Sequence, residues 1–159
     1  MREILLNGEN LDISTVVQVA DAGQRAGSFR VSIAPDAISR IVASRQSVER
    51  MVSAGRTVYG ITTGFGAFKS KLIASSETAE LQRNLLMSHA VGVGPLLPEP
   101  TVRAMMLVRA NALAKGYSGI RPETLQALLE LLNRGVHPVV PSQGSVGASG
   151  DLAPLAHMA

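Results

Sequence analysis

The stretch that most constrains the fold is TVRAMMLVRANALAK, residues 101–115, which is apolar along most of its length. Between its two ends the polar exceptions are Arg103, Arg109 and Asn111. A helix with so little polar surface has to be buried on most of its sides. We therefore expect it at the centre of a helical body, and few short domains could cover such a helix unaided.

The composition points in the same direction. Hydrophobic residues make up 46% of the 159 residues, whereas aromatic residues make up 3% and tryptophan is absent. The core therefore has to be filled by Leu, Val, Ile, Ala and Met, which suit packed helices. We expect a mainly α fold with short strands and structured loops, organised as a single unit over residues 1–159 that stops within a helix.

Local patterns predict the order of the elements. They indicate two short strands, at 3–6 and 29–34, with a helix between them from Asp12 or Ser14 to about Arg25. Further helices are expected at 35–55, 77–90 and 101–115. Two more follow, one that stops at 133–135 and a last one that begins at Asp151. Residues 57–68 contain three glycines and show no helical period, which is typical of a structured loop. A second Gly-rich connector covers residues 136–150.

Charge and residue usage exclude several classes of function. The net charge of +3 comes from basic residues scattered singly and without interleaved aromatics, so no nucleic-acid partner is expected. There is no cysteine for a disulfide or a nucleophile, and no stretch reaches the roughly 18 apolar residues of a membrane span. We therefore expect a soluble, cytoplasmic protein. We also expect no metal, because His89, His137 and His157 fall at no recognised ligand spacing.

The tripeptide Ala148-Ser149-Gly150 can carry chemistry of its own. In a tightly bent backbone the Gly150 nitrogen can attack the Ala148 carbonyl and close a five-membered ring. Loss of water from the ring and of the Ser149 hydroxyl would leave an exocyclic methylidene, an electrophile that ordinary side chains do not offer. The simpler reading is a Gly-rich turn before a helix, which could hold an anion or merely allow positive φ.

Two separate motifs resemble one enzyme family. GSVGASGDLAPLAHMA, residues 144–159, is similar to the segment from which certain ammonia-lyases make their methylidene-imidazolone group autocatalytically. YGITTGFGAF, residues 59–68, resembles the tyrosine-bearing active-site loop of the same family. The resemblance implies the N-terminal domain of a longer lyase with the fumarase/aspartase-like helical fold, assembled as a homotetramer.

The resemblance also implies roles for individual residues. Tyr59 would be the base, and the ring made from Ala148, Ser149 and Gly150 would be the electrophile, with no external cofactor. The Ser88-His89 pair is similar to the histidine-specific branch of the family, in which the histidine contacts the substrate imidazole. The implied reaction converts L-histidine to trans-urocanate and ammonia, with this chain alone incomplete. Supporting positions are Gly60, Gly66 and Asp151; Asp151 could cap the last helix.

Two alternatives stay open. One is a tyrosine or phenylalanine ammonia-lyase or aminomutase of the same family, although tyrosine-selective members tend to show His-Leu and phenylalanine-selective members Phe-Leu where this chain has Ser88-His89. The other belongs to a different class. It is a non-catalytic fragment whose Gly-rich turn binds an anion, or whose exposed apolar helices bind a partner.

Overall fold

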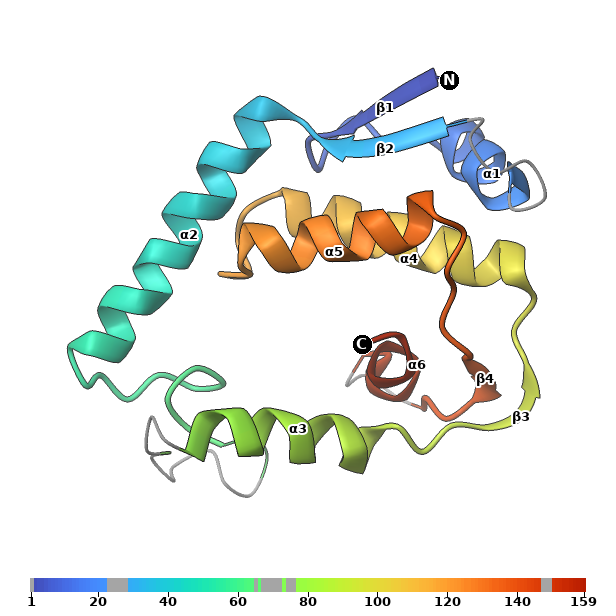
Figure 1. Cartoon of the computed structure of the whole chain (residues 1–159). Coiled ribbons are helices and arrows are strands. Elements are labelled where there is room, and N and C mark those ends of the chain that lie inside the picture. Colours follow the sequence, from blue (N-terminus) through green and yellow to red (C-terminus); the bar gives the residue numbers. More distant parts are fainter. Residues whose placement is uncertain (1, 23–28, 65, 67–72, 74–76, 147–149) are drawn as a thin grey trace. The chain divides into compact units, whose positions relative to one another are not determined.

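The computed structural model describes residues 2–22, 29–64, 66, 73, 77–146 and 150–159 (Figure 1). They form two compact units. The first unit combines Met1–Arg45 with Leu96–Val140, and the second combines Gln46–Pro95 with Pro141–Ala159. Each unit is therefore assembled from segments that are far apart in the sequence.

The first unit begins with two parallel strands joined by a helix. The elements are β1 (Arg2–Leu6), α1 (Ile13–Asp21) and β2 (Phe29–Ile33). Two neighbouring parallel strands need a crossover connection, and α1 lies within this connection. In the register of the pair, Ile4 of β1 lies opposite Val31 of β2. The Asp12 carboxylate accepts a hydrogen bond of 2.7 Å from the Thr15 amide, so the predicted cap is confirmed. The α-helix ends at Asp21, and the predicted end at about Arg25 lies outside the described residues.

Two helices complete the core of the first unit. α4 (Glu99–Ala114) packs against α1 and against α5 (Pro122–Asn133), and α5 packs against β2. On α4, Met106, Leu107 and Ala110 have no exposed surface, whereas Val108, which lies among them, is 51% exposed. The predicted helix is confirmed, but its expected burial on most sides is not, because Val108 and Ala112 lie on an exposed side of α4. On α5 the buried side chains are Leu125, Leu129 and Leu132, which follow the helical period of the sequence.

A buried arginine connects three parts of this core. Arg103 is 7% exposed, and its Nε donates to the Val19 carbonyl oxygen at 2.9 Å, in the last turn of α1. Its Nη1 lies 2.8 Å from His137 Nε2 and 3.5 Å from the Leu132 carbonyl oxygen at the end of α5. Helix C-termini carry unpaired carbonyls and partial negative charge, so they compensate the buried guanidinium. Arg103 thus holds the ends of α1 and α5 on α4.

The stability of the first unit should depend on the protonation of His137. Burial lowers the pKa of His137. The Glu99 carboxylate, 3.7 Å from Nδ1, raises this pKa and the Arg103 guanidinium lowers it, so that the pKa lies below its usual value overall. The unfolded chain therefore takes up this proton at a higher pH than the folded chain. We expect the free energy of unfolding to fall as the pH drops below about 6.5 and to level off below the folded pKa.

Urea denaturation at a series of pH values, with His137→Gln as the comparison, measures this effect. The glutamine cannot titrate but can still accept a bond from Arg103. Subtracting the two pH profiles isolates the contribution of His137, and identical profiles would show that His137 does not contribute.

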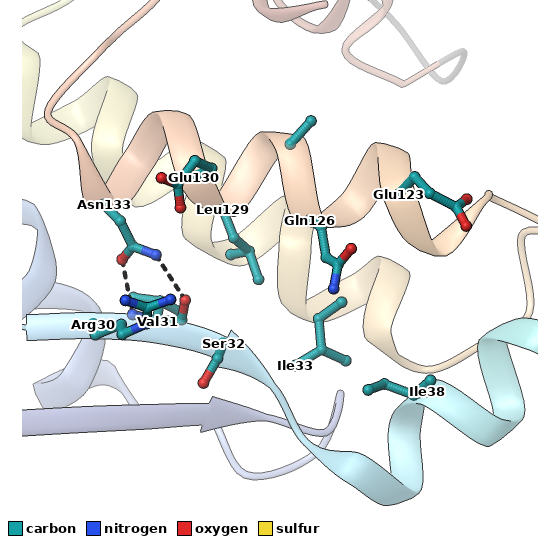
Figure 2. A pocket seen from close by; sticks show the side chains of 11 residues that line it. Arg30, Val31, Ser32, Ile33, Ile38, Glu123, Gln126, Leu129, Glu130 and Asn133 are labelled. Atoms are coloured by element: carbon teal, nitrogen blue, oxygen red, sulfur yellow. Dashed lines mark hydrogen bonds between the residues drawn. The ribbon is translucent and has the colours of Figure 1, made fainter.

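A cavity of about 490 Å³ lies between β2 and α5 in the first unit. Figure 2 shows Asn133 reaching from the end of α5 to β2. Its Oδ1 accepts from the Val31 amide at 2.8 Å, and its Nδ2 donates to the Val31 carbonyl at 2.9 Å. Because β1 occupies the other edge of β2, the Asn133 amide takes the place of a third strand at this residue. The cavity contains none of the predicted site residues.

Replacing Asn133 by alanine should lower the free energy of unfolding by about 2 kcal/mol, since it leaves two backbone groups of the buried Val31 without partners. Urea denaturation of the chain measures the loss. Gln126→Ala is the matched control, because Gln126 lines the same cavity. Equal stability of the two variants would contradict this reading of the Asn133 contacts.

The second unit contains the remaining elements. α2 (Pro35–Ser53) starts in the first unit and ends in the second, and it is followed by α3 (Thr78–His89), β3 (Val93–Leu96), β4 (Pro141–Gln143) and α6 (Leu152–Met158). β3 pairs with β4, and α6 packs against α3 and β4 (Figure 1). Within the described part of the chain, no helix has the length and apolar character needed to cross a membrane.

Candidate active site

The predicted tyrosine and histidine meet in a cavity of the second unit. This cavity of about 640 Å³ has apolar side chains over most of its lining. Its lining residues are Tyr59, Gly66, Leu85, Leu86, His89, Leu152, Leu155 and Ala156. They come from the loop after α2, from the second half of α3 and from α6. Three segments separated in sequence therefore enclose one space.

The loop that carries Tyr59 is held by two threonines. Thr62 Oγ1 accepts from the Val58 amide at 2.8 Å and donates to the Arg56 carbonyl at 2.6 Å. Thr63 is 2% exposed, and its Oγ1 accepts from the Gly60 amide at 3.3 Å. Backbone groups on both sides of Tyr59 are thus bound by the same Thr-Thr pair. Sequence reasoning did not single out these threonines; the signal was two adjacent hydroxyls in a Gly-rich loop, where side chains often bond the local backbone.

His89 at the end of α3 is oriented by its own helix. Its Nδ1 lies 2.8 Å from the Leu85 carbonyl oxygen, one turn earlier. A carbonyl oxygen only accepts, so Nδ1 has to carry a proton for this hydrogen bond. In the neutral ring Nε2 is then an acceptor, and it is the nitrogen left for a bound molecule.

Ser88 contacts the His89 ring and does not itself line the cavity in the described part of the chain. Its hydroxyl donates to the same Leu85 carbonyl at 2.9 Å and lies 3.0 Å from His89 Nδ1. Ser88 is absent from the described lining of the cavity. The structure therefore places Ser88 where it supports the orientation of the neighbouring histidine.

The segment before α6 contains the predicted electrophile. Ala148 and Ser149 lie outside the described residues. Gly150 has φ of 82°, in the left-handed region that favours glycine, and a Cβ added there would meet no atom within 4 Å. The Ser145 hydroxyl donates to the Gly150 carbonyl at 3.0 Å, so the chain folds back on itself across this segment. α6 begins immediately afterwards and contributes Leu152 to the cavity.

The remaining predicted positions are distributed as follows. Gly60 and Gly66 have φ of 73° and 56°, and Gly66 lines the cavity. Asp151 stands at the N-cap position of α6, but its side chain makes no capping hydrogen bond there, so the capping prediction is wrong in this respect. Its ψ of 59° is not that of an extended N-cap residue, the usual conformation for such a bond. Among the described residues, no three metal-ligating side chains gather as a possible metal site.

Comparison with known proteins names the class to which this helical fold belongs. The family model for aromatic amino acid lyases matches residues 11–159. The chain therefore belongs to the aromatic amino acid lyase family. The predicted family and the mainly α-helical lyase fold are both confirmed.

Individual relatives of this chain include histidine ammonia-lyases. Histidine ammonia-lyase of Chloroflexus aurantiacus is 54% identical over 159 residues, and that of Caldanaerobacter subterraneus is 52% identical over 158. These matches cover 100% and 99% of this chain, which spans about 30% of the length of either relative.

Solved structures of the family have the same fold. The crystal structure of histidine ammonia-lyase from Trypanosoma cruzi is similar with a TM-score of 0.83 and 38% identity, over 99% of this chain and 28% of that one. Ergothionase from Treponema denticola is similar with a TM-score of 0.90 and 36% identity, over 98% and 30%. Tyrosine aminomutase from Streptomyces globisporus is similar with a TM-score of 0.85 and 37% identity, over 98% and 28%.

Proposed function

We propose that this chain is the N-terminal portion of a histidine ammonia-lyase that converts L-histidine to trans-urocanate and ammonia. The observation that carries the proposal is the single cavity lined by Tyr59, by His89 and by the helix that follows Ala148-Ser149-Gly150. The identity of about 50% to histidine ammonia-lyases supports the same substrate.

The two ionisable residues of the described lining have complementary tasks in this reaction. The β-proton of histidine is scarcely acidic and ammonia leaves poorly, so the enzyme needs a positioned base and an electrophile. Tyr59 is the base in this proposal. His89 Nε2, an acceptor in the tautomer described above, accepts the N–H of the substrate imidazole. Leu85, Leu152 and Leu155 offer an apolar surface to the substrate.

The described residues fit the electrophile that the family resemblance implies. The methylidene-imidazolone group would be held by Ala148, Ser149 and Gly150, from which it forms, and it supplies an electron-poor carbon to the substrate. Support for this group comes from the described end of the tripeptide, where Gly150 has φ of 82° and its carbonyl accepts a hydrogen bond from the Ser145 hydroxyl.

The proposal extends to the assembly and setting of the complete protein. Exposed apolar side chains of the second unit include Met87, Val91, Val93 and Val146, each more than half exposed. Such surface is normally covered in a finished protein. We therefore propose that residues 1–159 are part of the N-terminal domain of a longer chain, which assembles as a homotetramer in the cytoplasm.

Steady-state kinetics of the full-length protein test the function. We expect formation of urocanate from L-histidine, with a kcat/KM at least about 100-fold above that for L-tyrosine or L-phenylalanine, because His89 Nε2 would be left unpaired by phenylalanine. A β-amino acid formed from L-tyrosine would instead indicate an aminomutase. No turnover of any of the three, together with an unmodified Ser149, would indicate the non-catalytic alternative.

A further inference from the structure

A hydrogen bond between Gly92 and His157 connects two segments of the candidate site. The Gly92 amide, just after the end of α3, donates to His157 Nε2 at 2.9 Å. His157 lies on α6 next to Ala156, which lines the cavity, and Gly92 follows closely on His89, which also lines it. The mechanism proposed above gives no task to either residue.

The backbone around this bond is packed too closely to move independently. A Cβ added at Gly92 would lie 2.9 Å from His157 Nε2 and 3.1 Å from Pro141 Cβ. A Cβ added at Gly144 would lie 3.0 Å from Gly92 Cα and 3.1 Å from Ala153 Cβ. Glycine is therefore required where the chain leaving His89 crosses the chain that leads to Ala148, and the His157 ring lies at this crossing.

Local hydrogen bonds link Gly92 to His89. The Ala90 amide donates to the Leu86 carbonyl at 2.9 Å, and the Val91 amide donates to the His89 carbonyl at 2.8 Å. The bond from Gly92 to His157 continues this series onto α6. A shift of Gly92 would therefore be transmitted to the backbone of His89, and with it to the side chain that faces the cavity.

We propose that His157 is a positioning residue: by accepting the Gly92 amide, its unprotonated Nε2 holds the His89 end of the site at a defined place relative to α6. This inference rests on the proposed function as far as the effect on catalysis is concerned. The hydrogen bond itself can be tested without turnover.

Two substitutions in the full-length protein separate the hydrogen bond from packing. His157→Leu keeps an apolar body but removes the acceptor, whereas His157→Gln can place an amide oxygen near the position of Nε2. Met158→Leu, one residue further along α6, is the control. For each variant we would measure kcat and KM for L-histidine and the amide hydrogen exchange of the peptide that contains Gly92.

We expect His157→Leu to raise KM for L-histidine about fivefold or more with a smaller change in kcat, and to speed exchange around Gly92, as loss of a hydrogen bond of ordinary strength predicts. His157→Gln should restore KM and protection to near the wild-type values. Equal KM and exchange in wild type and His157→Leu, or failure of His157→Gln to rescue a folded protein, would overturn the proposal.

The exchange measurement also keeps this inference separate from the proposed function. If the wild-type protein does not turn over histidine, the proposed function fails. Fast exchange at Gly92 in His157→Leu and slow exchange in His157→Gln would still support the positioning contact. If histidine is turned over but exchange is the same in all variants, the function stands and the role of His157 is refuted.

Discussion

Replacing Ser149 by alanine should lower turnover of L-histidine by about 10³-fold or more, which corresponds to a loss of roughly 4 kcal/mol of transition-state stabilisation. Without the β-oxygen the ring cannot lose the second water, so the methylidene carbon cannot form. Intact-mass analysis with fragmentation gives an independent readout. In the wild type we expect a deficit of two water masses confined to Ala148–Gly150, and in the variant one at most.

The control for this variant is Ser142→Ala, because Ser142 is an exposed residue of β4 outside the tripeptide. It should keep both the mass deficit and the activity. Turnover by Ser149→Ala close to that of the wild type would show that the electrophile is not made from this serine. A wild-type protein without the mass deficit would show that the protein, as prepared, cannot catalyse the reaction in the proposed way.

Replacing Tyr59 by phenylalanine should reduce kcat for L-histidine by about 10²–10⁴-fold, the usual range for removal of a general base. The change removes one oxygen and leaves the ring that lines the cavity, so KM should change little. Rapid-mixing or steady-state measurement of urocanate formation over a range of substrate concentrations separates the two constants.

The chain provides a matched control for the tyrosine substitution. Tyr117, the other of its two tyrosines, is 87% exposed and belongs to the first unit, so Tyr117→Phe should leave both constants unchanged. If Tyr59→Phe raised KM and left kcat unchanged, Tyr59 would be a binding residue and another group would have to remove the β-proton.

Local patterns were sufficient for the type and order of most elements. The spacing of Leu125, Leu129 and Leu132 predicts α5, because the helical period places these side chains on one buried face. The contact that holds the last turn of α1 could not be predicted in this way. That turn lies against Arg103 of α4, which donates to the Val19 carbonyl from a distant part of the sequence. A long-range contact of this kind has no local signature.

The sequence by itself identified the family and the residues that we propose for its chemistry. Tyr59, His89 and Ala148-Ser149-Gly150 stand in motifs whose residue types suit the proposed ammonia-lyase reaction. Only the tertiary structure brought Tyr59, His89 and α6 to one cavity and showed the bond from Gly92 to His157. These features depend on where separate backbone segments cross. Periodicity and composition carry no information about such crossings, since they describe only neighbours along the chain.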